Sequence, residues 1–229
     1  MSLLNQWVAR HHPGTVERLA AYLDIPRLIE YIRRFLYDQF FPNAEFCGMD
    51  VDLALCPEIP NDLGIKVFHS ATSTYYAPSD VSGTGGMHRE RIRAVPSWKG
   101  GPPRHDCVYV ENNDDVGFLG LHVARTKLFF SFSFRHVIYP CALVEWFSKF
   151  GDAPCEDTGL WRVEPDFDGI GLRASSVIHI GAILRGAHLI GACGTQPLPS
   201  NFTYHDTFDT FSLFYVNKYA DHHAHEIAF

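Results

Sequence analysis

The sequence predicts an α+β chain in which a short helical segment precedes a β-rich, barrel-like domain. Two observations support this prediction. Apolar residues recur at helical spacing near the N-terminus, and short β-rich runs separated by turn residues follow further along the chain. The 229 residues are enough for one large domain or two small ones with a full core. We therefore divide the chain into a helical segment, 1–44, and a barrel-like domain, 45–229.

Two helices are expected in the first segment, over 3–23 and 25–41. Asp24 is placed to cap the second helix, Pro26 suits its first turn, and Pro42 ends it. One face of this helix is apolar and should either pack on the β-rich domain or remain partly exposed as a lost interface. That face carries Leu28, Ile32, Phe35, Leu36 and Phe40.

Strands are expected throughout the second segment, joined by Gly, Pro, Asn and Asp turns that are typical of a small barrel or sandwich. A long, loop-like link around one short element is expected over 78–105, and loops of this length tend to be functional or mobile. The expected strands are 65–76, 107–111, 123–134, 137–147, 160–163, 177–180 and 187–190.

The run 129–134 alternates phenylalanine with serine after its first residue, which is the pattern of a half-buried strand. Arg135 and His136 then predict a two-residue turn into the next strand, so that the two strands form a hairpin. The core built on this hairpin should include Phe130, Phe132, Leu143, Trp146 and Ile178.

The composition excludes some classes of protein. Nineteen basic and 26 acidic residues give a net charge of −7, so a nucleic-acid-binding surface would have to be a local basic patch. No apolar run is long enough to span a membrane, and the N-terminal residues do not have the pattern of a signal peptide. The six cysteines are widely spaced and include no Cys-x-x-Cys pair, which indicates reduced thiols in a nuclear or cytosolic protein.

The strongest candidate site is a basic segment, 88–105, in this acidic chain. Its arginines at 89, 91 and 93 alternate, so on a strand they would share one face. Guanidinium groups offer forked donors to phosphate oxygens, and a neighbouring tryptophan can add stacking. The candidate nucleic-acid-binding residues are Arg89, Arg91, Arg93, Trp98, Lys99 and Arg104. The alternative is a solvated strand face whose charge is neutralised by the acidic stretch 151–168.

The C-terminal tail is a weaker candidate for a divalent metal site. On a helix, His222, His225 and Glu226 could point the same way, and imidazole with carboxylate is a ligand set for zinc. The alternative is a polar chain end. Asp50, Asp52 and Glu58 are the carboxylates that a metal-dependent nuclease would use here, but they lie in an irregular loop among prolines, which does not favour a gathered metal site. No motif for nucleophilic catalysis is present, so we expect no catalytic residue.

Several phrases together resemble the C-terminal part of fungal Plavaka-type transposase-like proteins, in the Kyakuja–Dileera–Zisupton group. They cover nearly the whole chain: VFHSA (67–71), YAPSD (76–80), GGMHRE (85–90), PSWKGG (96–101), YPCALV (139–144), SVIH (176–179), AHLI (187–190) and FYVNKYADHH (214–223). The resemblance implies an RNase H-like nuclease domain upstream, which would contain all three metal-binding carboxylates. Residues 1–44 would then be the trailing edge of that domain. This chain departs from the family pattern at Gly181, where an aspartate is expected, and at His225, where a phenylalanine is expected.

A looser similarity links the strand order to a bromo-adjacent-homology barrel. In such barrels a strand ending in Trp-Phe, here Trp146-Phe147, precedes an acidic loop, here 151–157, and a later Val-Ile-His strand closes the barrel. These modules bind chromatin or proteins and do no chemistry. The resulting expectation is a non-catalytic region of a transposase-like protein that contacts DNA or protein partners. The alternatives are a protein or chromatin interaction module without DNA affinity and a metal-dependent nuclease fragment.

Overall fold

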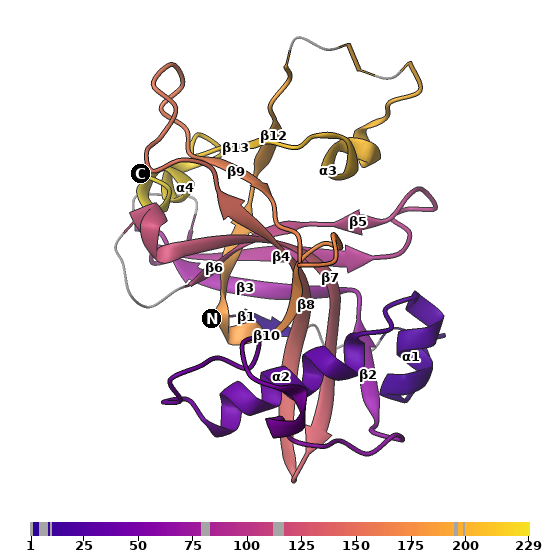
Figure 1. The fold of residues 1–229 in the computed structure, drawn as a ribbon. Helices are drawn as coiled ribbons and strands as arrows, with labels where there is room; N and C mark the ends of the chain where they lie inside the picture. The colour runs from indigo at the N-terminus through magenta and orange to yellow at the C-terminus, as the bar shows by residue number, and fades with distance from the viewer. Residues whose placement is uncertain are drawn as a thin grey trace.

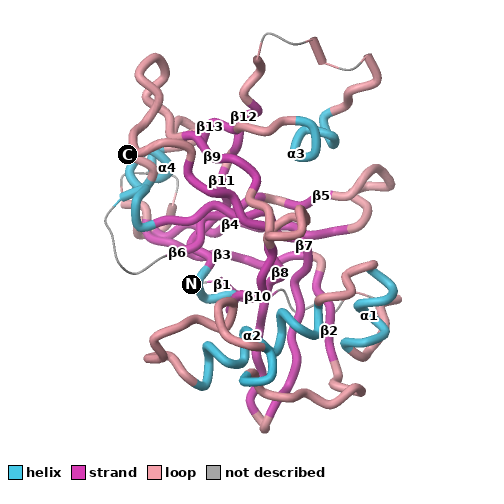
Figure 2. The backbone as a smooth tube through the Cα atoms, viewed as in Figure 1, coloured by secondary structure: helices cyan, strands magenta, loops and turns pink. Residues whose placement is uncertain are grey.

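The computed structural model describes residues 2–4, 9, 11–78, 83–111, 117–194, 197–198 and 200–229. It has a mixed α+β fold with few helices and a nearly closed antiparallel sheet that resembles a barrel (Figure 1). The predicted α+β, barrel-like class is therefore confirmed at this level. Helices α1 (Val16–Leu23) and α2 (Leu28–Phe40) lie at the lower end of the view, whereas α3 (Thr207–Thr210), α4 (His222–Ile227) and the longer loops lie at the upper end (Figure 2).

The chain contains the following strands and helices. In order they are β1 (Ser2–Leu4), α1 (Val16–Leu23), α2 (Leu28–Phe40), η1 (Leu53–Leu55), β2 (Ile65–Phe68), β3 (Ser70–Tyr76), β4 (Met87–Val95), β5 (Arg104–His105), β6 (Cys107–Glu111), η2 (Gly117–Gly120), β7 (Leu121–Phe134), β8 (Val137–Lys149), β9 (Arg162–Pro165), β10 (Ser175–His179), η3 (Ile180–Ala182), β11 (Ile183–Ala187), β12 (Leu189–Gly191), η4 (Tyr204–Asp206), α3 (Thr207–Thr210), β13 (Phe214–Val216) and α4 (His222–Ile227).

The long hairpin β7–β8 is the centre of the larger sheet, which runs β11-β6-β7-β8-β9-β13-β12. Each of its strands pairs with two different neighbours along one edge. β7 pairs with β6 near its start and with β2 near its end, while β8 pairs with β10 and then with β9. A register shift between Thr126 and Leu128 lets the hairpin bend there, as β-bulges do. A second, smaller sheet has the strand order β1-β3-β4-β5.

The predicted hairpin is confirmed. β7 ends at Phe134 and β8 begins at Val137, so only Arg135 and His136 form the turn. Both residues have positive φ angles, 49° and 66°, which is the combination that a type I′ turn requires. This turn type matches the right-handed twist of the strands, and it therefore keeps the pairing in register over the whole hairpin.

The predicted core is confirmed at three of its five positions. Phe130, Phe132 and Leu143 are buried, whereas Trp146 and Ile178 are only partly buried. The indole Nε1 of Trp146 donates a hydrogen bond to Ser176 Oγ (2.8 Å), which keeps this edge of the ring beside a polar group. The prediction that 129–134 is a half-buried strand is also incomplete. Phe129 is fully buried in a second apolar cluster on the opposite face of β7.

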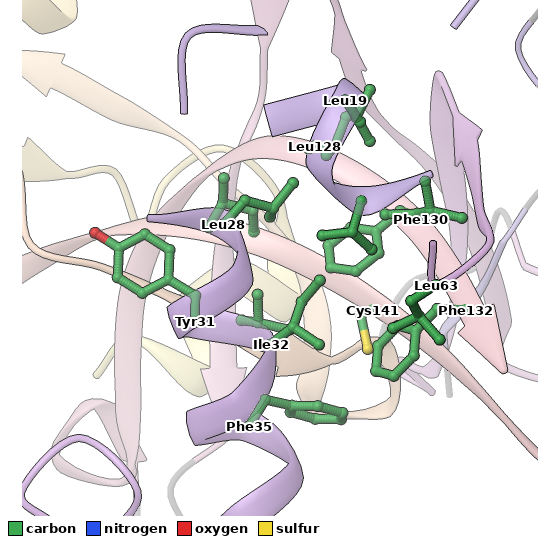
Figure 3. Close-up of a cluster of buried hydrophobic side chains, with 14 of the residues drawn as sticks. Leu19, Leu28, Tyr31, Ile32, Phe35, Leu63, Leu128, Phe130, Phe132 and Cys141 are labelled. Atoms are coloured by element: carbon green, nitrogen blue, oxygen red, sulfur yellow. The ribbon is translucent and has the colours of Figure 1, made fainter. Parts of the chain in front are cut away.

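Helix α2 packs against the end of the barrel, so the apolar face found in the sequence is covered (Figure 3). Leu28, Ile32 and Leu36 are completely buried, and the ring of Phe35 meets Phe132 and Tyr139 edge to face. Phe40 is partly buried against the same cluster. The first of the two expected outcomes, packing on the β-rich domain, is the one observed.

The predicted helix over 3–23 is wrong in its first part. Ser2–Leu4 forms β1, which pairs with β3, and α1 begins only at Val16. Pro13 and Gly14 precede that start, and both disfavour a continuous helix. Pairing with the free edge of β3 supplies the backbone hydrogen bonds of residues 2–4 instead. Residues 5–8 and 10 of the predicted helix lie outside the described residues.

Asp24 also has a different role from the one predicted. It lies at the end of α1 with φ 54°, and its N–H bonds back to Ala20 and Ala21. Aspartate tolerates this left-handed conformation better than most residues, so it ends one helix rather than capping the next. Consequently α2 starts at Leu28, with Arg27 as its N-cap, and Pro26 lies before the helix.

Some strand boundaries differ from the prediction. The run 65–76 is divided at His69 into β2 and β3, which belong to different sheets, and 187–190 is divided at His188. The expected loop-like link 78–105 contains the nine-residue strand β4. Charged residues occupy alternate positions of this strand, so an alternation of apolar residues does not mark its bounds. Strand β13 was missed because it has only three residues.

Replacement of Leu143 by alanine should lower the free energy of unfolding by about 2–5 kcal/mol, because it leaves a cavity beside the hairpin. Chemical denaturation measures this change. The matched control is Val137→Ala on the same strand, where the side chain is exposed, and a change within about 0.5 kcal/mol is expected there. Equal effects at the two positions would contradict the assigned core.

Candidate nucleic-acid interface

Strand β4 presents its arginines on one face. It pairs with β3 from Met87 to Arg93, and it meets β5 only at its last two residues. The alternate residues point inward: Ile92 is buried in the central apolar cluster, and Glu90 accepts a hydrogen bond from Gly186 N (2.9 Å). Arg89 and Arg91 are consequently exposed, and Arg93 is partly buried.

Trp98 lies among three of the other candidate residues. The guanidinium carbons of Arg93 and Arg104 are 4.7 and 5.5 Å from its ring centroid, and Lys99 Nζ is 5.7 Å from it. The structure thus gathers the predicted residues into one basic patch, formed by Arg89, Arg91, Arg93, Trp98, Lys99 and Arg104. However, Trp98 holds the patch's own cations through cation–π contacts, so it is poorly placed to stack on a nucleic-acid base.

Asp106 is the carboxylate that partly neutralises this patch, and the sequence reasoning missed it. Its side chain accepts hydrogen bonds from Arg93 N (2.9 Å) and Arg104 Nε (2.7 Å). No ion pair joins the patch to residues 151–168, all of which are described; in that stretch Asp168 instead pairs with Arg27 (2.6 Å). Within the described chain, Arg89 and Arg91 make no ion pair, so their charges face solvent.

The arginines of β4 also line a cleft of about 950 Å³. Residues from β11, η4, α3 and the segment before α4 line it as well. The charged lining comprises five arginines and three carboxylates: Arg89, Arg91, Arg93, Arg104, Arg185, Glu90, Asp106 and Asp221. His105 adds no positive charge at neutral pH, because burial lowers its pKa to about 4.

Arg185 is buried in the wall of this cleft and is neutralised there. Its guanidinium donates two hydrogen bonds to Asp221 (2.8 and 2.5 Å), and its Nε lies 3.8 Å from Glu90. These hydrogen bonds lower the pKa of Asp221 to about 2. Gly186 lets Glu90 approach the backbone of β11, since a Cβ at this position would lie 2.7 Å from Glu90 Oε1 and the carboxylate would have to shift.

The same contacts fix the C-terminal helix α4. Asp221 caps this helix by accepting a hydrogen bond from Ala224 N (2.8 Å), while it holds Arg185. His223 is buried and stacks on the ring of Tyr75 at 4.7 Å. The histidine-rich tail therefore connects α4 to β3 and β11.

The predicted metal site in the C-terminal tail stays a prediction. Residues His222, His225 and Glu226 do lie on a helix, but nowhere in the described residues do three His, Cys, Asp or Glu side chains gather to hold a metal ion. His225 instead packs between the rings of Tyr219 and Phe229. The same finding applies to Asp50, Asp52 and Glu58; Asp52 accepts a hydrogen bond from Ala54 N and so caps a short helical turn.

Comparison with known proteins found no match. No protein-family model, no curated protein and no solved structure matches the chain. The resemblance to Plavaka-type proteins therefore stays a prediction. None of the helices in the described ranges has the length and apolar character needed to cross a membrane. All six cysteines, each at a described position, are free thiols.

Replacement of Asp221 by asparagine should destabilise the protein at neutral pH, because the variant loses the ion pair with Arg185. The folded pKa of Asp221 is depressed, so its stabilisation is present above its ordinary pKa of 3.8 and is lost as the pH falls towards about 2. The difference in unfolding free energy between wild type and Asp221→Asn should therefore shrink over this range.

Urea denaturation at several pH values measures this difference. The control is Asp62→Asn, at an exposed carboxylate that forms no ion pair among the described residues, and its difference from wild type should stay near zero. A pH-independent difference for Asp221→Asn would contradict the assigned ion pair.

Proposed function

We propose that this chain is the non-catalytic, DNA-binding C-terminal region of a transposase-like protein. The observation that carries the proposal is the exposure of Arg89 and Arg91 on one face of β4, without an ion pair in the described residues. Two unpaired guanidinium groups on alternate positions of a rigid strand suit contacts with successive phosphates. The basic patch around Trp98 extends this surface through Lys99 and Arg104.

The net negative charge of the chain is compatible with this role. DNA responds to the local field of the surface that approaches it, and the acidic stretch 151–168 forms no ion pair with the basic patch. The negative charge elsewhere would favour one orientation, with β4 towards the DNA, and it would oppose binding by other faces. A DNA target also implies a nuclear location.

The barrel supports the looser similarity to bromo-adjacent-homology domains. In our proposal the nearly closed sheet is such a barrel, with the strand containing Trp146 and Phe147 followed by the acidic loop. Catalysis would belong to an upstream nuclease domain, and the region described here would position DNA for it. Helices α1 and α2 would mark the junction between the two parts.

A second candidate, a protein or chromatin interaction module without DNA affinity, is favoured by one specific feature. The loop closed by the bridge between Phe167 and Arg173 exposes three large apolar side chains, on Phe167, Ile170 and Leu172. Apolar groups exposed together on a loop are common at contacts with other proteins. A metal-dependent nuclease has no comparable support, since the described residues contain no ligand set.

The proposal predicts salt-dependent DNA binding that fails in the Arg89→Ala/Arg91→Ala double variant. Fluorescence anisotropy with a random duplex at several salt concentrations measures it. The log–log salt slope should fall by about 0.9 for each phosphate contact removed from duplex DNA, because each contact releases counterions.

The matched control is Arg18→Ala/Lys66→Ala, which removes the same charge from exposed positions outside the basic patch. It should keep the affinity close to that of wild type. Equal loss in the two double variants would mean that only total charge matters. Absence of DNA binding by the wild-type protein at low salt would contradict the proposed function and favour the protein-interaction candidate.

A further inference from the structure

We infer that the cleft beside β4 binds single-stranded DNA, with phosphates at its arginine rim and a base inside. This inference rests on the proposed function and names its substrate more closely. The cleft, at about 950 Å³, is at the upper end of the range for ligand sites, and it joins the exposed arginines to aromatic side chains. A duplex keeps its bases stacked inside and presents phosphates, whereas a single strand can turn a base into a cleft.

The charge distribution separates the rim from the interior. Arg89 and Arg91 are exposed and make no ion pair in the described residues, so they are available for phosphates. Further in, the charge of Arg185 is balanced by Asp221 and Glu90, and its guanidinium lies over the ring of Tyr75 (4.7 Å). A neutralised, partly aromatic interior suits an uncharged base better than a second phosphate.

Tyr204 in η4 offers a stacking surface that Trp98 does not. Its side chain lines the cleft and is 80% exposed. The neighbouring ring of His205 is perpendicular to it, at 5.4 Å and 89°, and among the described residues no ring is stacked parallel to Tyr204. Single-strand-binding proteins combine such an aromatic platform with a positively charged groove.

Tyr109 supplies a buried polar group that lacks a partner. The residue lines the cleft with 0% exposure, and its hydroxyl has no hydrogen-bond partner in the described structure. A buried donor without an acceptor is costly, and a base carbonyl inside the cleft would accept its hydrogen bond. Burial raises the pKa of Tyr109 well above its usual range, so the hydroxyl keeps its proton at neutral pH.

The test is a fluorescence-anisotropy titration with a labelled oligothymidine of about 12 nucleotides, a length within the usual single-strand site sizes. The same strand annealed to its complement is the duplex probe. The single strand should bind more tightly than the duplex at equal salt. Tyr204→Ala should weaken single-strand binding about 5-fold or more, the lower end of a base-stacking contribution, and Tyr204→Trp should restore it.

Tyr22→Ala is the matched control, because Tyr22 is also well exposed (60%) but lies on α1 outside the cleft. It should leave both affinities unchanged. Tyr109→Phe removes only the hydroxyl and should also weaken single-strand binding; its unfolding curve shows whether the fold is intact.

Three outcomes decide the inference. Tighter single-strand binding that depends on Tyr204 supports it. Equal or tighter duplex binding, unaffected by Tyr204→Ala but lost in Arg89→Ala/Arg91→Ala, overturns the single-strand site and leaves the proposed function standing. Absence of binding to both probes at low salt overturns the proposed function and the inference together.

Discussion

The hairpin β7–β8 is the constraint on which the rest of the structure depends. Its strands contribute buried side chains to all three apolar clusters, for example Phe130, Phe129 and Phe147. Because both faces of β7 are covered near its middle, a slip in register would exchange the side chains of two different clusters. The two-residue turn at Arg135 and His136 prevents such a slip, and so it fixes where every neighbouring strand can pair.

The orientation of the arginines in the basic patch depends on how β4 packs against the hairpin β7–β8. Ile92 of β4 enters the cluster that also contains Phe129 and Val144, and this burial determines which alternate residues face outward. Glu90 is anchored to β11 through Gly186, which prevents a rotation of the strand. Arg89 and Arg91 are therefore positioned by the buried contacts of their strand, and their side chains remain available to a ligand.

The sequence predicted those elements whose signal is local. The hairpin, β6 and the apolar face of α2 follow from alternation, turn residues and helical spacing, and each was found close to its expected position. Strand β1 and the division at His69 depend on which distant edge is free, and no local pattern contains that information. The short element expected within 78–105, on which the alternating arginines would share one face, is β4, but its bounds were not predicted because charged side chains occupy alternate positions.

The candidate site was predictable in composition but not in geometry. Six residues close in sequence were expected to form one patch, and short-range contacts around Trp98 do bring most of them together. The roles of Arg185 and Tyr109 depend on pairing between β6 and β11, which are far apart in the chain. The role of Asp106 depends on its approach to Arg93 of β4, 13 residues earlier in the chain. The sequence also did not predict that Trp98 contacts the basic side chains around it. These cations compete with any nucleic-acid base for the face of the indole ring.

Strand β13 has a consequence for how the chain folds during synthesis. It lies between β9 and β12, although it follows both of them in the sequence. The sheet therefore has a gap until Val216 has left the ribosome, and β9 and β12 expose unpaired edges during that interval. Asp221 follows Val216 by five residues and binds Arg185, so the segment that fills the gap in the sheet is followed directly by the residue that holds the cleft wall. A nascent chain that pauses before this point would present its edge strands to other chains.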